Sequence, residues 1–247
     1  MFPLVHHYIN TCLNPVLHPY TVYGGLFPDL ASGTGYDRNT AHEIGQSFYA
    51  WCKNNAPEGL PLARGIICHG NKPAGVDYYA DEYWPGKDRG WCFQQGAYWL
   101  PKVKNATGLP DEMLWWKSHN FIEIALEYLL IQKYSAINRG LINALEDKNA
   151  AKDVSKILSR FTGIEAKSFT AVYQKAAGIF ALDPVTPLHL AEKQADAFRL
   201  RHNILTADVN AMAELIIAIS LDLKDCYEDY LALVEKKVGQ ALANYPA

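Results

Sequence analysis

Apolar residues recur every three to four positions through much of the second half of the chain. This spacing gathers them on one face of a helix, so it predicts helices over 150–161, 166–181, 187–203, 206–222 and 224–243. We find no clear alternation of apolar and polar residues of the kind that marks a half-buried strand. The pattern therefore predicts an all-α fold, a multi-helix bundle.

The first half holds three further segments with a helical pattern. We expect helices over 40–55, with Thr40 as the N-cap, over 60–69, and from Pro110 or Asp111 past residue 130. The stretch 70–109 is rich in glycine and proline and is predicted to be a long irregular loop. Loops of that length inside a compact domain usually carry function.

Composition narrows the class of protein. The chain has 247 residues, 49% of them hydrophobic and 20% charged, which fits one helical domain over 1–247. Its net charge of −3, without a basic stripe, gives no sign of nucleic-acid binding. No apolar run is long enough for a transmembrane helix, no secretory signal stands at the start, and the five cysteines show no C-x-x-C spacing. We therefore expect a cytoplasmic protein.

Candidate chemistry is concentrated in residues 1–135, and its first element is the pair His119 and Glu123. Side chains four residues apart lie about 6 Å from one another on one helix face, so an imidazole and a carboxylate can converge on one cation. Such pairs also occur on solvated helix faces. Here the apolar residues around the pair indicate that the helix is at least partly buried.

The second element is His69, at the end of the apolar segment LARGIICH, followed by Asp77 and Asp81. A histidine in that position is usually a hydrogen-bonded core residue or a helix cap. The two aspartates that follow favour a different interpretation, because divalent cations bind mixed sets of imidazole and carboxylate.

A third set comprises His6, His7, Asp29 and His42. Pro28 is expected to stiffen a turn that exposes the Asp29 carboxylate, and His42 is expected near the start of the 40–55 helix. Each residue alone is more often structural. Together these groups place imidazoles and carboxylates on several separate elements, which is the pattern of a multinuclear metal site.

The segments VHHYINT, GGLFPDL, AHEIGQSF, ARGIICHG and SHNFIEIALE follow one another in this order. The order resembles that of the zinc-dependent phospholipase C family, whose helical fold is shared with single-strand-specific fungal nucleases. The resemblance covers residues 1–135 and implies metal ligands at His6 or His7, Asp29, His42, His69, His119 and Glu123.

One position departs from the family pattern. An aspartate that bridges two metals normally follows the helix-ending histidine by four residues, but Pro73 stands there. Asp77 or Asp81 is expected to supply the missing carboxylate; otherwise one metal position is lost. The resemblance implies one to three divalent metal ions, zinc first among them, and a small-molecule or lipid-like phosphoester substrate.

These observations predict a metal-dependent hydrolase of phosphate esters. A metal-bound water would attack the substrate, and Asp29, Asp77 or Asp81 would orient that water. Aromatic residues of 70–109 could line the pocket or merely pin the loop, and possible phosphate contacts are Arg64, Lys72, Lys87 and Arg89.

Two alternatives remain open. A non-catalytic helical binding module with a degenerate metal site would explain Pro73. An HD-type phosphohydrolase is also helical and metal-dependent, but the chain lacks the His-Asp dipeptide of that class.

Overall fold

The computed structural model describes residues 3–14, 17–180 and 183–246, and within these ranges the chain is all α, as predicted. The ranges contain no β-strand, only an isolated bridge between Trp84 and Lys87. The α-helices are α1 (Pro3–Leu13), α2 (Pro19–Leu30), α3 (Arg38–Glu43), α4 (Gly45–Asn55), α5 (Leu60–His69), α6 (Trp91–Ala97), α7 (Leu100–Thr107), α8 (Asp111–Lys133), α9 (Ala136–Glu146), α10 (Lys148–Thr162), α11 (Ala166–Phe180), α12 (Pro187–His202), α13 (Val209–Leu223) and α14 (Tyr227–Leu242). Short 3-10 turns cover Ala31–Thr34 and Pro57–Gly59, and a π-helical turn, η3, covers Tyr78–Glu82.

The periodic segments form the helices that the pattern predicted. The expected 60–69 helix is α5, the long helix from residue 111 is α8, and the five C-terminal segments are α10 to α14 within a few residues at each end. Position 181, the end of one expected helix, lies outside the described residues.

The pattern missed α1, α2 and α9. Helix α2 is buried on nearly every side, from Thr21 to Pro28, so it has no polar face to reveal its period. The expected turn at Asp29 is wrong for the same segment, because Pro28 lies inside α2 and Asp29 in its last turn.

The prediction of an irregular loop over 70–109 is wrong for much of its length. Helices α6 and α7 and the turn η3 lie within it. Several of its prolines and glycines stand at helix ends: Pro101 is in the first turn of α7, and Gly90 is the N-cap of α6. These residues therefore delimit short helices rather than prevent them.

The expected 40–55 helix is divided in two at Ile44. Asp37, not Thr40, is the N-cap, and its carboxylate accepts a hydrogen bond from the Thr40 N–H at 2.7 Å. His42 consequently lies in the last turn of the short helix α3 instead of at the start of a long one.

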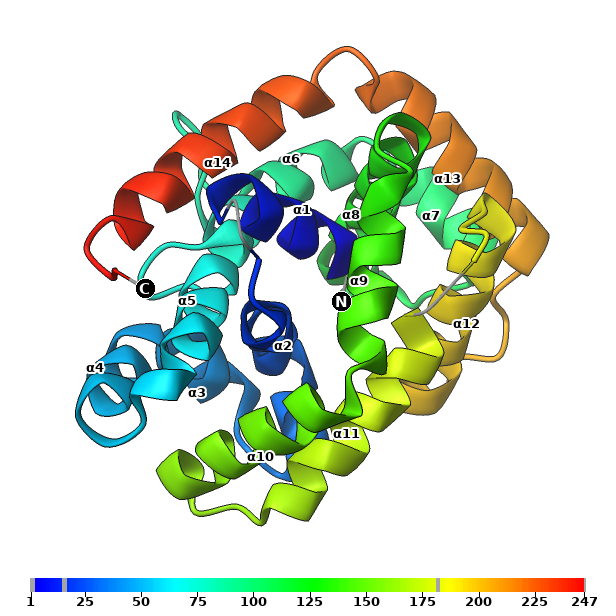
Figure 1. Cartoon of the computed structure of the whole chain (residues 1–247). Coiled ribbons are helices and arrows are strands. Elements are labelled where there is room, and N and C mark those ends of the chain that lie inside the picture. Colours follow the sequence, from blue (N-terminus) through cyan, green and yellow to red (C-terminus); the bar gives the residue numbers. More distant parts are fainter. Residues whose placement is uncertain (1–2, 15–16, 181–182, 247) are drawn as a thin grey trace.

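Helices α2 and α5 cross in close contact near the middle of the molecule (Figure 1). A Cβ on Gly24 would lie 2.1 Å from the Leu62 carbonyl oxygen, and one on Gly65 would lie 2.2 Å from that of Thr21. Glycine is required at both positions because the two backbones touch there. This crossing brings the end of α5, and with it His69, against the last turns of α2.

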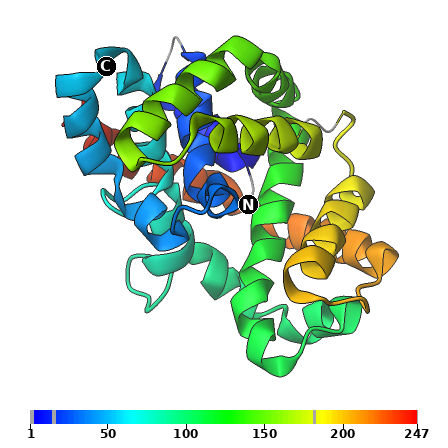
Figure 2. The ribbon, with the colours of Figure 1, turned by 90° about the horizontal axis from the view of Figure 1, so that it is seen from below.

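Helix α8 lies between the N-terminal helices on one side and α12 and α13 on the other (Figure 2). Its buried face carries Phe121, Ile122 and Leu126, and the buried core includes residues of both halves of the chain. Burial of this apolar surface is the main favourable contribution to folding. No helix within the described ranges combines the length and apolar character needed to cross a membrane.

Candidate metal centre

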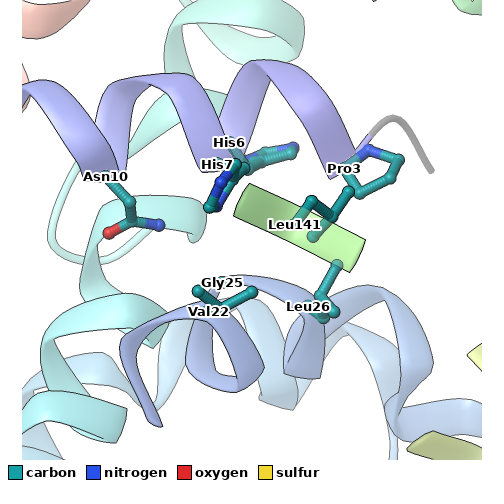
Figure 3. A pocket seen from close by; sticks show the side chains of 8 residues that line it. All are labelled: Pro3, His6, His7, Asn10, Val22, Gly25, Leu26 and Leu141. Atoms are coloured by element: carbon teal, nitrogen blue, oxygen red, sulfur yellow. The ribbon is translucent and has the colours of Figure 1, made fainter. Parts of the chain in front are cut away.

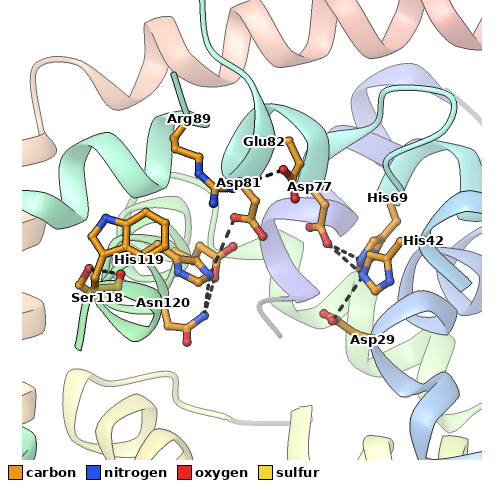
Figure 4. Close-up of polar contacts among 12 residues, drawn as sticks. Asp29, His42, His69, Asp77, Asp81, Glu82, Arg89, Ser118, His119 and Asn120 are labelled. Atoms are coloured by element: carbon orange, nitrogen blue, oxygen red, sulfur yellow. Dashed lines mark hydrogen bonds and ion pairs between the residues drawn. The ribbon is translucent and has the colours of Figure 1, made fainter. Parts of the chain in front are cut away.

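Two clusters of imidazoles and carboxylates lie close together around the ends of α2, α3 and α5, the turn η3 and the first half of α8 (Figure 4). We call the first the Asp77 cluster (Asp29, His42, His69, Asp77) and the second the Glu123 cluster (Asp81, His119, Glu123). Within each cluster, one ligand atom from every residue lies within 4.8 Å of the others.

In the Asp77 cluster, backbone carbonyls fix the orientation of two imidazoles. His69 Nδ1 lies 2.6 Å from the carbonyl oxygen of Gly25, and His42 Nδ1 lies 2.7 Å from that of Arg38. A carbonyl oxygen only accepts, so each Nδ1 carries the proton and donates it. In its neutral form each ring then presents an unprotonated Nε2 to the cluster, which is the tautomer that binds a metal. Burial would lower the pKa of His69, but Asp77 and Asp29 outweigh it and raise the pKa.

These Nε2 atoms face a carboxylate. His42 and His69 each approach Asp77 Oδ2 to 3.1 Å. For His42 the approach lacks hydrogen-bond direction, and the buried Nε2 has no hydrogen-bond partner among the described residues. Lone pairs of nitrogen and oxygen repel at this distance unless a proton or another cation lies between them. The arrangement therefore calls for a proton or a metal ion between these atoms, and His69 Nε2 is within hydrogen-bond distance of Asp77 Oδ2.

Asp29 extends the cluster from the last turn of α2. Its Oδ1 lies 3.8 Å from His42 Nε2 and 3.2 Å from Arg38 Nη2. The Asp29 side chain is only 11% exposed, whereas that of Arg38 is 53% exposed. Arg38 therefore lies on the open side of the cluster with part of its guanidinium accessible.

His6 joins the same group from α1. Its Nε2 lies 3.3 Å from Asp77 Oδ1, and its ring stacks on that of His69 with centroids 3.9 Å apart. Asp77 thus contacts imidazoles from three helices: one on Oδ1 and two on Oδ2.

His7, the other candidate at this position, points elsewhere. Both histidines line the small pocket shown in Figure 3, but the Nε2 of His7 would lie 3.1 Å from a Cβ on Gly140 of α9. Consecutive residues of a helix differ in direction by about 100°, so only one of the two histidines can reach Asp77. The structure thus brings His6, and not His7, to Asp77, and neither histidine belongs to the two clusters.

The Glu123 cluster is held by α8 and η3. His119 Nε2 lies 3.9 Å from Asp81 Oδ1. The Asn120 amide lies 3.2 Å from His119 Nε2 and donates to Glu123 Oε2 at 3.2 Å. Phe93 of α6 stacks on the His119 ring with centroids 4.1 Å apart and so fixes its plane.

The carboxylate pKa values of the two clusters are shifted in opposite directions. Burial would raise the pKa of Asp77, but His69, His42 and His6 outweigh it and hold the pKa well below its usual range. Burial raises the pKa of Glu123 to about 8, with Asp77 adding to the effect, and burial together with Glu123 and Asp77 raises that of Asp81. The carboxylates of the Glu123 cluster therefore have too little positive charge near them to offset their burial.

The donor set fits a divalent cation. Four ligand atoms arranged tetrahedrally at the usual Zn–N and Zn–O distances are about 3.4 Å apart. Three contacts in the Asp77 cluster, of 3.1–3.8 Å, scatter around this value, and all four ligand atoms lie within 4.8 Å of one another. Asp81 Oδ1 is also buried without a hydrogen-bond partner in the part of the chain that the structure describes, as a metal-ligating oxygen would be.

Two polar residues of the site were not predicted from the sequence. Asn120 follows His119 directly, and Arg38 belongs to the RNT segment of α3. No sequence pattern marks either residue as part of a site. Arg38, for example, reaches Asp29 only through the packing of α3 against α2.

Three of the basic residues predicted to contact phosphate have other partners, although Arg89 also lies over the Phe93 ring that stacks on His119. Arg64 binds the Tyr245 carbonyl and Asn14, Lys72 pairs with Glu43, and Arg89 pairs with Glu82. Of the aromatic residues of 70–109, Trp84 and Trp91 pack on Tyr230 of α14, whereas Phe93 contacts the site.

Comparisons of the chain with protein-family models, with curated proteins and with solved structures found no match. The assignment of a function therefore depends on the geometry of the two clusters and on the motifs that form them.

Proposed function

We propose that the protein is a metal-dependent hydrolase of phosphate esters, with zinc as its first candidate metal. The observation that carries the proposal is the approach of two imidazole Nε2 atoms, from His42 and His69, to Asp77 Oδ2 at 3.1 Å each, in a buried site. Imidazole with carboxylate is the ligand set of catalytic zinc sites.

The residues divide into two sets of ligands. Asp29, His42, His69 and Asp77 would hold one ion, and Asp81, His119 and Glu123 another. His6 extends the first set through Asp77. The Asp77 carboxylate would supply the position left without an aspartate at Pro73, so the motif order resembling zinc-dependent phospholipases C is kept with a displaced carboxylate.

A bound Zn²⁺-type ion lowers the pKa of its water towards neutrality and so supplies a nucleophile at neutral pH. The chain's own groups would complete the reaction. Asp29 or Asp81 would accept a hydrogen bond from the attacking water and orient it. Arg38 is accessible and bonded to Asp29, so its guanidinium would contact a phosphate oxygen and stabilise charge that develops in the transition state.

Hydrolysis of bis(p-nitrophenyl) phosphate and p-nitrophenyl phosphate, after the metal-free protein is reloaded with Zn²⁺, tests this function. We expect turnover of at least one ester, its loss in His69→Ala and His119→Ala, and its retention in the control His189→Gln, a histidine outside both clusters. Binding of zinc without turnover of any phosphoester would favour a non-catalytic binding module instead.

A further inference from the structure

Helix α8 carries a third acidic residue on the face that holds His119 and Glu123. Glu127 follows Glu123 by one helical turn and is 1% exposed. It belongs to neither cluster. A buried carboxylate needs hydrogen bonds or a counter-charge, so its partners indicate what it does.

One partner is the beginning of α1. Glu127 Oε1 accepts a hydrogen bond from the Leu4 N–H at 2.8 Å. The first N–H groups of a helix have no partner within the helix, and a negative charge is favourable there. The first turn of α1 has no acidic residue of its own, so Glu127 caps this helix from α8.

The first turn of α1 also carries His6, which contacts the Asp77 cluster. His6 follows Leu4 by two residues, and its Nε2 is the atom 3.3 Å from Asp77 Oδ1. The hydrogen bond from Leu4 to Glu127 therefore fixes the end of α1 from which His6 reaches Asp77.

The other partner comes from the C-terminal half. Lys193 of α12 places its Nζ 3.9 Å from Glu127 Oε2, and its side chain is 17% exposed. Burial raises the pKa of Glu127, and Lys193 opposes this shift. The lysine thus favours the charged form of a carboxylate that burial would otherwise protonate.

We propose that Glu127 is a positioning residue: it holds the first turn of α1 on α8 so that His6 meets Asp77, and Lys193 is its counter-ion. Its effect on metal affinity rests on the proposed function, whereas its effect on the placement of His6 does not. Through Lys193, helix α12 supports the metal centre without contributing a ligand.

Two double variants isolate the hydrogen bond. Both carry Lys193→Met, combined with Glu127→Gln in one (the Gln variant) and with Glu127→Leu in the other (the Leu variant). Both remove the buried charges, but only the Gln variant keeps an oxygen that accepts the hydrogen bond from the Leu4 N–H. Glu112→Gln, an exposed change in the first turn of α8, is the control. Far-UV circular dichroism and thermal melting check that each variant is folded.

The first readout is the imidazole ¹⁵N–¹H NMR spectrum of the metal-free protein, with the His6 signals assigned from His6→Gln. We expect displaced His6 signals in the Leu variant, unchanged ones in the Gln variant and the control, and constant His189 signals throughout. If the Leu variant does not fold, Glu127→Asp, whose shorter side chain no longer reaches Leu4, should displace the His6 signals instead.

The second readout is metal affinity. Residues that orient ligands typically change it 10- to 100-fold, so we expect a loss of roughly that size in the Leu variant and less than about threefold in the Gln variant. Identical His6 spectra in the two double variants would overturn the proposal while leaving the metal function intact. A wild-type protein that binds no metal would refute the metal function, and the NMR comparison would still decide the role of Glu127.

Discussion

His69 Nε2 lies 3.1 Å from Asp77 Oδ2 while its Nδ1 is held 2.6 Å from the Gly25 carbonyl oxygen. The ring is therefore fixed at one nitrogen and directed at a carboxylate with the other. The same relationship recurs in His42, so two helices deliver imidazoles to one oxygen atom. A cation shared by these groups, as in the proposed function, would occupy the space between them.

Replacement of Asp77 by Asn should remove the charge on which three imidazoles converge. We expect metal affinity to fall at least about 100-fold, more than for loss of a residue that only orients a ligand. Isothermal titration with Zn²⁺ measures this. Glu82→Gln is the matched control because Glu82 lies in the same helical turn but is half exposed. Equal affinities in the two variants would contradict the assignment of Asp77.

Removal of the metal should lower the melting temperature. A ligand at about 1,000 times its dissociation constant stabilises the folded state by about 4 kcal/mol, which in a chain of this size corresponds to about 10 °C. Differential scanning calorimetry with and without a chelator checks this shift. The chelator should have no effect on a protein in which His42, His69 and His119 are all alanine, because both clusters then lack imidazole ligands.

His7 should make folding stability depend on pH. Burial lowers its pKa from 6.5 to about 4, so between these values the unfolded chain binds a proton that the folded chain does not. Protonation of the unfolded chain therefore lowers the free energy of unfolding as the pH falls from 6.5 towards 4, by about 3 kcal/mol in total. Above pH 6.5 the residue is neutral in both states and this loss is absent.

The variant His7→Leu tests this dependence. His7 Nδ1 has no hydrogen-bond partner among the residues described, so an apolar side chain should be tolerated. Urea denaturation at pH 7 and pH 4.5 should show a smaller loss of stability in the variant than in the wild type. Parallel losses would show that His7 is protonated equally in both states.

Gly65→Ala should destabilise the fold and disturb the site together. The new Cβ would lie 2.2 Å from the Thr21 carbonyl oxygen, and separation of α2 from α5 would draw Gly25 away from His69. We expect a loss of about 1–3 kcal/mol in urea denaturation.

Gly178→Ala in α11 is the control for this change. A Cβ there meets nothing within 4 Å, so the substitution should be neutral or stabilise the protein by up to about 1 kcal/mol. Equal destabilisation by both changes would mean that the α2–α5 contact has no special role.

Local pattern sufficed for parts of the site and not for others. His69 ends a periodic segment and His119 and Glu123 share a helix face, so both could be read from the sequence. The choice of His6 over His7 depends on the direction in which α1 packs. The placement of Asp77 in one cluster and of Asp81 in the other depends on the path of the chain after α5. These arrangements depend on tertiary packing and cannot be read from the spacing of residues along the chain.

Titration of the metal-free protein with Co²⁺, followed by its visible absorption, tests the shared cation most directly. Two clusters of this kind predict saturable binding of about two ions per chain, with the absorption of low-coordinate cobalt bound by imidazole and carboxylate. A spectrum that stays that of aqueous Co²⁺ at every concentration would contradict the account.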